Sequence, residues 1–412
     1  MLSLRSNNFL SNLFFILGIY IVIFSGLLVT AFFLDCTEIF SIGNLLNWDA
    51  AHYYDLMQKG YHDSNVAFFP LFPIFWKAIH ASTLGIAITN GMIYCLSLAW
   101  LATEYRFSKR NLFIVCSLPS LFFMFLPFSE SVFFFTVTVF LIGLKKENQF
   151  LIGAGLLLSG LARPVATILI PAIVITEYYF SNGKNLKLRN VYLQLIICIA
   201  ALLMVFILQY CETGKWFTFF EYQKNWNNYL RIPTFPLSSW AGGYIVRLDA
   251  VAFLSGIASL TWLVSILVKM QVAEKQLYNK AFILSLAYLG ILTFTILLTK
   301  GVVLNSLNRY IFASPFLVLA LSTFLERAAF SRKWLVILFL CSTLFWFLFA
   351  SYVHIQAFLK FETLSLYLCL VYTAANKTDK KISQLSFLSL ICINIFFFIA
   401  FMYRFLSGDW VG

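Results

Sequence analysis

Charge is scarce in this chain of 412 residues, because only 11% of them are Asp, Glu, Lys or Arg. Soluble domains carry about 25% charged residues, so a soluble globular protein is excluded. Intrinsic disorder is excluded as well, since it requires low hydrophobicity, and 61% of this chain is apolar. Histidine is rare, and the eight cysteines form no CxxC pair. We expect no cofactor, and a divalent metal is left open without support from the sequence. A disulfide between Cys36 and Cys211 is left open.

Long apolar runs make up most of the sequence. A helix that spans a bilayer needs about 20 apolar residues, and the alternation of a membrane barrel strand is missing from these runs. The sequence predicts an all-α, polytopic transmembrane helical bundle that forms one integral membrane domain over 1–412, with roughly 11–13 spans. Several runs are short, which indicates tilted, broken or re-entrant helices. The expected spans are 9–34, 84–102, 112–127, 132–144, 150–162, 165–180, 191–210, 248–268, 281–299, 310–325, 334–352, 361–376 and 384–403.

The net charge of +12 does not indicate nucleic acid, because membrane proteins collect Lys and Arg on their cytoplasmic loops. Most of the basic residues fall on one set of connections if the N-terminus is cytoplasmic. Two long loops, 35–83 and 211–247, then lie on the extracytoplasmic side and hold three of the four histidines. Long loops are uncommon unless they are functional, so we expect the chemical site on that face.

The first long loop contains an expected helix that Asn47 would cap and Gly60 would end. Asp55 and Lys59 are four residues apart on it, which predicts a structural ion pair. Asp49, His52 and Tyr53 stand at positions i, i+3 and i+4, so we expect them to share another face of the same helix.

Asp49 has two interpretations. A carboxylate at the start of a helix can serve as a base, or it can simply be a charge that the helix dipole favours. His52 beside it is weak evidence for a metal.

Three charged residues fall at expected outer ends of spans: Glu130, Arg163 and Arg309. An arginine within a membrane segment costs roughly 2.5–3.5 kcal/mol on insertion scales, so such a residue usually has a partner or a ligand. Arginine also matches phosphate with two donors. The alternative is that each side chain snorkels at a helix end.

Aromatic side chains gather in both long loops. The segment 67–76 carries two prolines and suits an interfacial position along the membrane surface, although it also fits a simple aromatic belt. The segment 220–233 is rich in aromatic rings and amides. Rings pack on the C–H faces of sugars and amides bond their hydroxyls, so this segment suits a lid over the first loop.

At these positions the sequence resembles the GPI mannosyltransferase 2 (PIG-V) family, with the compact length favouring a prokaryotic relative. The residues that carry the resemblance are Trp48-Asp49, Gly60-Tyr61, the 67-AFFP-70 segment with Pro73, the 128-FSES-131 turn, Arg163 in 160-GLARP-164, Arg309-Tyr310, and Gln223 and Trp226 in 223-QKNWNNY-229. An acidic residue expected before AFFP is represented only by Asp63.

The resemblance implies a GT-C fold with amphipathic helices in the first extracytoplasmic loop. It implies transfer of mannose from a polyprenyl (dolichyl-type) phosphate donor to a lipid-linked or glycan acceptor, by an inverting single displacement with Asp49 as base. Glu130 and His52 would position sugar hydroxyls or orient Asp49. The resemblance implies substrate-binding roles for Trp48, Tyr53, Tyr61, Asp63, Phe69, Arg163, Gln223, Trp226, Arg309 and Tyr310.

The membrane would be the cell (inner) membrane of a prokaryote or the endoplasmic reticulum of a eukaryote. Other classes remain as alternatives. A secondary transporter would have charges near the bilayer midplane and paired broken helices. A lipopolysaccharide-type ligase or polymerase would use a diphosphate-linked donor, and a structural membrane scaffold would have no site.

Overall fold

The computed structural model describes residues 2–36, 38–181, 188–239, 243–273, 278–327, 331–349, 355–376 and 379–411. Within these ranges the secondary structure is helical, and the β-type pairing is limited to an isolated bridge between Ser238 and Val303. The predicted all-α class is therefore confirmed.

The helices divide into α-helices and three short 3-10 helices. The α-helices are α1 (Leu2–Phe33), α2 (Ile42–Leu45), α3 (Asp49–Lys59), α4 (Leu71–Ile79), α5 (Thr83–Tyr105), α6 (Lys109–Ser117), α7 (Glu130–Lys146), α8 (Gln149–Ala162), α9 (Leu169–Phe180), α10 (Leu188–Thr213), α11 (Thr218–Asn225), α12 (Gly243–Ala273), α13 (Lys280–Lys300), α14 (Leu307–Phe312), α15 (Pro315–Arg327), α16 (Arg332–Leu344), α17 (Trp346–Phe349), α18 (Ile355–Ala374) and α19 (Lys380–Leu406). The 3-10 helices are η1 (Asp63–Ala67), η2 (Pro119–Phe125) and η3 (Pro164–Ile168).

Seven segments of the described chain are long and apolar enough to cross a membrane, and the count is eight if η2 and α7 form one bent span. The helix α8 and the pair η3–α9 are apolar but shorter. Fewer helices reach full spanning length than the roughly 11–13 expected from the apolar runs, because several runs are short or broken. With its composition, this makes the chain a multi-pass integral membrane protein.

Prolines set two of the breaks. Pro119 begins η2 and Pro164 begins η3, since proline has no N–H to continue the preceding helix. The run 112–127, expected as one span, is therefore α6 followed by η2. The axes of η2 and α7 then meet at 98°, which places Glu130 at the N-terminus of α7 inside the bundle.

Small polar residues fix where other helices begin. Ser82, Ser108, Asn148 and Asn279 each accept a hydrogen bond from the backbone N–H three residues later. Such caps satisfy N–H groups that have no partner within the helix. They give the bundle sharply defined helix starts beside its loops.

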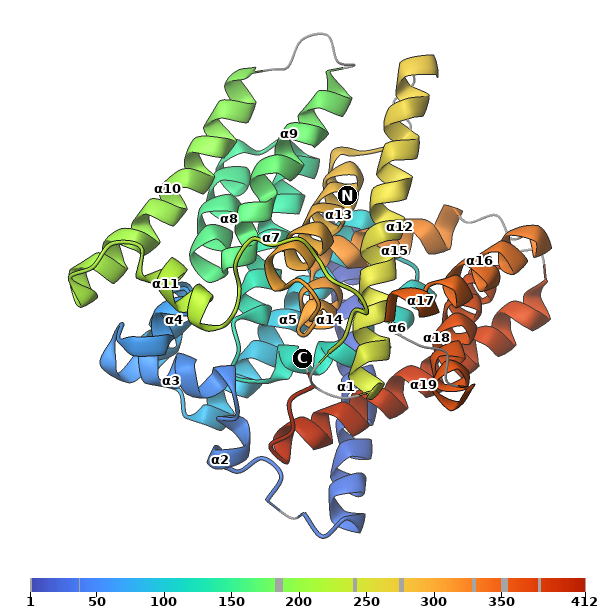
Figure 1. The fold of residues 1–412 in the computed structure, drawn as a ribbon, viewed down its shortest axis with the longest axis horizontal. Coiled ribbons are helices and arrows are strands. Elements are labelled where there is room, and N and C mark those ends of the chain that lie inside the picture. Colours follow the sequence, from blue (N-terminus) through green and yellow to red (C-terminus); the bar gives the residue numbers. More distant parts are fainter. Residues whose placement is uncertain are drawn as a thin grey trace.

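The helices α7 and α8 pack closely on each other. A Cβ at Gly155 would lie 2.5 Å from the backbone nitrogen of Phe140, so the two helices approach through that glycine. Small residues at such crossings are typical of membrane helices. In α13, 72% of the most apolar stretch is buried, against 11% in Arg332–Phe349. Figure 1 accordingly shows α13 near the centre of the molecule and α16 at its edge.

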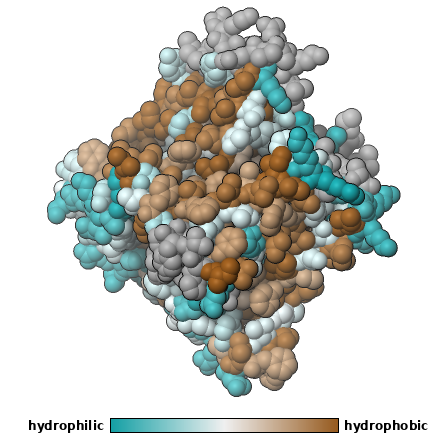
Figure 2. Space-filling model, turned by 45° about the vertical axis from the view of Figure 1, so that its right-hand side comes forward, coloured by the Kyte–Doolittle hydropathy of each residue, from teal (hydrophilic) through white to brown (hydrophobic). Residues whose placement is uncertain are grey.

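The outer surface of the bundle is largely apolar. Phe32 and Phe33 at the end of α1 are 73% and 76% exposed, and Figure 2 shows hydrophobic residues spread over much of one face, with hydrophilic groups toward its margins. An apolar surface of this extent marks a contact region, here with lipid.

The two long loops meet at one end of the bundle. The α11 helix packs against η1, and Gln209 at the end of α10 donates its side-chain amide to the backbone oxygen of Val66 at 2.8 Å. In Figure 1, α3, α4 and α11 accordingly lie close together. In the second loop, α11 covers the start of the segment 220–233 that is rich in aromatic rings and amides. In the first loop α4 begins after Pro70 and holds Pro73 in its first turn, where a missing N–H costs no helical bond.

Candidate active site

Asp49 is the first residue of α3, and its side chain is 28% exposed. The residue before it, Trp48, occupies the N-cap position with a φ of 56° and no side-chain cap. Asn47 instead donates its amide to the backbone oxygen of Phe405 at 3.0 Å. The prediction that Asn47 caps this helix is therefore wrong, because Trp48, with its positive φ, occupies the N-cap position. Gly60 ends the helix with a φ of 80°, as expected.

Glu130 is the first residue of α7, and its side chain is fully buried. A carboxylate in the first turn is favoured by the helix dipole. Even so, a buried charge needs a partner of opposite sign, because removing the charge from water costs roughly several kcal/mol in a protein interior.

Two arginines supply that partner. Arg163, between α8 and η3, places Nη1 2.9 Å from Oε1 of Glu130. Arg309, on α14, pairs through Nε with the same oxygen. Nη1 of Arg309 also lies 2.6 Å from Oδ2 of Asp49. The four residues thus form a continuous chain in the order Asp49–Arg309–Glu130–Arg163, which we call the ion-pair chain.

The ion-pair chain is electrically balanced and nearly closed to solvent. The side chains of Arg309 and Arg163 are 3% and 6% exposed, so Asp49 is its accessible end. Burial acts to lower the pKa of Arg309, but the Glu130 and Asp49 carboxylates outweigh it and raise the pKa above its ordinary value. The second oxygen of Glu130, Oε2, has no hydrogen-bond partner among the described residues.

Aromatic rings enclose both guanidinium groups. Arg309 lies 4.8 Å from the ring centre of Phe128, and Arg163 lies 5.2 Å from that of Tyr310. Cation–π contacts of this kind strengthen when they are shielded from water. They also keep the local dielectric low, so that the charges act strongly on any group that enters.

A second set of polar side chains holds the helix that carries Arg309. Asp249 Oδ1 accepts hydrogen bonds from the backbone N–H of Asn308 at 2.9 Å and from its side-chain amide at 2.7 Å. Ser120 donates to Oδ1 of Asn308 at 2.8 Å. Lys300 donates to the backbone oxygen of Asn305 at 2.8 Å and lies within electrostatic reach of Asp49 and Asp249.

Our sequence reasoning did not identify Asp249, Asn308 or Lys300. A carboxylate just inside the apolar run 248–268 was an available signal for Asp249, because intramembrane acids are costly and usually functional. No comparable signal marks Asn308, whose importance comes from its contact with another helix.

Tyr53 lies beside the ion-pair chain. Its hydroxyl is 2.6 Å from Oγ of Ser129, the residue before Glu130. Burial and the neighbouring Glu130 carboxylate raise the pKa of Tyr53 well above its ordinary value. The phenol therefore stays neutral and can donate or accept a hydrogen bond.

His52 belongs to an aromatic group and has no described hydrogen bond to Asp49. Its ring stacks on Phe68 at a centroid distance of 5.1 Å, and the Trp226 ring is 6.0 Å away. Oγ of Ser64 is 3.4 Å from Nδ1 of His52. The structure thus brings Trp226 of the second loop to the first loop, as a lid would, but it does not show His52 orienting Asp49.

Four other candidate residues lie in the two loops. Tyr61 donates its hydroxyl to the backbone oxygen of Phe68 at 3.1 Å, and its backbone N–H bonds Glu212. The ring of Phe69 packs on Phe219. The remaining two are Asp63, which is exposed at the start of η1, and Gln223, whose side-chain oxygen accepts from Asn228 at 2.8 Å.

Trp48 faces the C-terminal segment 407–411. Its indole N–H donates to the backbone oxygen of Gly408 at 3.1 Å, and its ring centre is 5.4 Å from that of Trp410. Trp410 in turn lies 5.9 Å from the guanidinium of Arg309. Segment 407–411 therefore forms one wall of the site.

Within the described part of the chain, no group of three or more His, Cys, Asp or Glu side chains is placed to hold a metal ion. Cys36 and Cys211 are both free thiols, so the structure contains no disulfide between them.

No family model matches this sequence, and no curated protein matches it. Among solved structures, the chain is similar to the crystal structure of ArnT from Cupriavidus metallidurans bound to undecaprenyl phosphate. The TM-score is 0.43 at 12% sequence identity, over 87% of this chain and 71% of the ArnT chain. The resemblance to the PIG-V family stays a prediction.

Proposed function

We propose that this protein is a GT-C-type membrane glycosyltransferase. It would transfer mannose from a polyprenyl-phosphate donor to a lipid-linked or glycan acceptor, at the extracytoplasmic end of the bundle. The observation that carries the proposal is the ion-pair chain, in which the partly exposed Asp49 pairs with Arg309, and the buried Glu130 links Arg309 to Arg163.

The proposed reaction requires a base and fixed positive charge, and the ion-pair chain contains both kinds of group. The leaving group is a phosphate, which is a weak base, so a strong general acid is not required. One base and fixed positive charge are sufficient. The acceptor hydroxyl oxygen attacks the anomeric carbon from the face opposite the phosphate. The bond from that carbon to the phosphate oxygen breaks, and its electron pair leaves with the phosphate. The hydroxyl proton passes to the Asp49 carboxylate, and the anomeric configuration inverts.

Arg309 is suited to receive the phosphate. Its ion pairs use Nε and Nη1, which leaves Nη2 without a partner among the described residues. The N–H groups of this free nitrogen can donate charge-assisted hydrogen bonds to a phosphate, and preorganised donors at developing charge typically contribute a factor of about 10²–10³ in rate. Arg163, held by the same Glu130 oxygen, supplies the second positive charge.

The loops offer surfaces for a sugar and a lipid. Trp226 is 40% exposed and lies beside His52 and Phe68, so its ring is available to pack on a sugar face. Leu230 and Ile232, which follow it, are 77% and 87% exposed and suit contact with lipid chains. These features support a sugar on a lipid carrier, and mannose itself rests on the family resemblance.

The proposal is tested by supplying purified protein in lipid nanodiscs with polyprenyl-phosphate mannose labelled in the sugar. A membrane extract from the cells that produce the protein supplies the acceptor. The measured quantities are labelled product and released polyprenyl phosphate. We expect both with the unaltered protein, and a loss of at least about 10²-fold in Asp49→Asn.

The matched control is Glu38→Gln, which changes an exposed acid of the same loop and should keep full activity. Equal transfer by Asp49→Asn and the unaltered protein would show that Asp49 is not the base. Absence of transfer with mannose and with a panel of other polyprenyl-phosphate sugars would refute the glycosyltransferase itself.

A secondary transporter is the alternative that one observation favours, namely the 98° break between η2 and α7. Transporters bind their substrates at such broken helices. A transporter would move an intact solute across a proteoliposome membrane and would release no polyprenyl phosphate in the transfer assay.

A further inference from the structure

A cleft between α1, α6 and α19 lies at the end of the bundle opposite Asp49. Its polar part has a volume of about 630 Å³ and is lined by residues from the start of α6 and of α19. The carbonyl of Phe405, at the other end of α19, contacts Asn47 next to the candidate active site. At about 1.5 Å per helical residue, Lys380 and Phe405 are roughly 37 Å apart. The cleft is therefore separate from the proposed donor site.

Three cations and no acid line this polar part: Lys109, Arg110 and Lys380. Lys109 and Lys380 are the first residues of α6 and α19, and the N-terminus of α6 adds its positive dipole end. The nearest acid in the sequence, Asp379, accepts hydrogen bonds from two backbone N–H groups of α19. The cleft thus carries a positive charge that its own lining does not neutralise.

Neutral oxygen atoms fix two of these cations. Lys109 donates to the backbone oxygen of Ser11 at 2.7 Å and to Oδ1 of Asn12 at 2.9 Å. Arg110 donates through Nη2 to the backbone oxygens of Ala374 and Ser383. These contacts orient the side chains without removing their charge, which is the condition for binding an anion.

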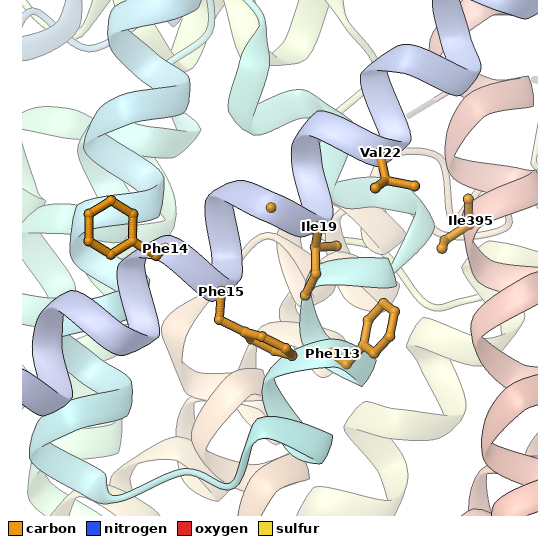
Figure 3. Close-up of a pocket in the computed structure, with 7 residues that line it drawn as sticks. Phe14, Phe15, Ile19, Val22, Phe113 and Ile395 are labelled. Carbon is orange, nitrogen blue, oxygen red and sulfur yellow. The ribbon is translucent and has the colours of Figure 1, made fainter.

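An apolar groove continues from the polar part. Phe15 and Phe113 line both, and from there the groove, with a volume of about 350 Å³, follows α1 past Gly18 to Val22 and Ile395. Figure 3 shows Phe15 turned toward Phe113, and Val22 facing Ile395 across the space between α1 and α19. A Cβ built on Gly18 would meet no atom within 4 Å, so the groove is open at that point.

We infer that this cleft binds one anionic phospholipid of the bilayer, with its phosphate headgroup at Lys109, Arg110 and Lys380 and an acyl chain in the groove along α1. Charge complementarity selects an anionic headgroup over a zwitterionic one. The groove on a membrane-facing helix selects a lipid over a free anion. Basic pockets between membrane helices bind lipid headgroups in this way, and both volumes fall in the usual range of ligand pockets, about 300–1,000 Å³.

The test uses the full-length protein in detergent, titrated with phosphatidylglycerol, phosphatidylcholine or inorganic phosphate. The measured quantities are the thermal unfolding temperature and the bound lipid seen by native mass spectrometry. We expect phosphatidylglycerol to bind and to raise the unfolding temperature, and the other two additions to have little effect. A rise of equal size with inorganic phosphate, or with phosphatidylcholine, would overturn the inference of an anionic lipid.

Two variants separate the headgroup from the acyl chain. Lys109→Gln with Lys380→Gln removes two charges, each worth about 1 kcal/mol near a charged lipid surface. We therefore expect affinity for phosphatidylglycerol to fall about 25-fold. Gly18→Leu fills the groove and should weaken binding by at least about tenfold, since it displaces several methylene groups.

Matched controls exclude general effects of charge and bulk. Arg332→Gln with Lys333→Gln removes the same charge at the start of α16, and Ser25→Leu places the same leucine side chain at another exposed position of α1. Both controls should bind as the unaltered protein does. Equal losses in the test and control variants, or full binding by Gly18→Leu, would show that the cleft is not the lipid site.

Discussion

Arg309 and Glu130 form an ion pair inside the bundle, although 179 residues separate them in the sequence. Arg163 binds the same Glu130 oxygen. Glu130 is therefore the shared anion that holds two arginines. The family resemblance implies that Glu130 positions sugar hydroxyls or orients Asp49, and that role stays a prediction beside its contacts with the two arginines.

Glu130→Gln should destabilise the protein. The change leaves two buried guanidinium groups with the Asp49 carboxylate alone, and removing one partner of a buried ion pair typically costs about 3–5 kcal/mol. Thermal unfolding in detergent, followed by tryptophan fluorescence, would measure the loss. Glu38→Gln, at an exposed position, should stay within about 0.5 kcal/mol of the unaltered protein. An unchanged unfolding temperature in Glu130→Gln would contradict the shared-anion role.

Arg309→Lys should reduce transfer more than Arg163→Lys does. Lysine keeps the charge but lacks the planar fork, so it cannot contact Asp49, Glu130 and a phosphate at once. We expect a loss of about 10²-fold for Arg309→Lys and a loss of about tenfold for Arg163→Lys, which has one described ion pair. Initial rates of polyprenyl phosphate release would measure both. The reverse order of the two losses would mean that Arg163 is the principal phosphate ligand.

Asp249→Ala should lower the rate through the position of Arg309. It removes the acceptor of two hydrogen bonds from Asn308, and leaving those buried donors unpaired costs about 1–3 kcal/mol. Asp249→Asn keeps one acceptor oxygen and should be milder. In steady-state kinetics, kcat should fall more than the donor KM rises. A loss of stability with normal kcat in the folded fraction would limit Asp249 to a structural role.

Asp55 should contribute stability that depends on pH. Burial acts against its ionisation, but hydrogen bonds from Lys59 and Asn65 and the charge of His62 outweigh burial and lower its pKa below 3.8. A lowered pKa in the folded state stabilises the protein at higher pH, and this contribution is lost as the pH falls through the folded value.

Asp55→Asn should therefore be less stable than the unaltered protein at neutral pH, by less than about 1 kcal/mol because the pair is partly exposed. The difference should shrink below about pH 4. Unfolding temperatures measured from pH 7 to pH 3 would test this. A difference that stays constant over that range would show that the carboxylate charge plays no part.

The sequence identified all four members of the ion-pair chain, because each is a charged residue beside an apolar run and such residues are few. It also predicted the ion pair between Asp55 and Lys59, which the structure contains at 3.0 Å. These are local patterns, in which hydrophobic length or helical spacing determines the outcome. Their roles in a reaction remain predictions.

The sequence could not show which charges meet. The contact of Glu130 with both arginines depends on the 98° bend after η2 and on the packing of α14 beside it, and neither is encoded in one segment. The contact of Trp48 with Trp410 likewise joins segments that lie far apart in the sequence, and the substrate-binding role implied for Trp48 stays a prediction. Contacts between distant segments depend on the whole bundle, so spacing within a motif does not predict them.

The equal number of carboxylates and guanidinium groups in the ion-pair chain has a consequence for turnover. A phosphate that draws N–H donors from Arg309 and Arg163 leaves Asp49 and Glu130 as built-in competitors for the same donors. In the proposed reaction, Asp49 must first release the proton that it accepts; the two carboxylates would then recapture the arginines and expel the spent lipid carrier. The site would then return to its starting state before the next cycle.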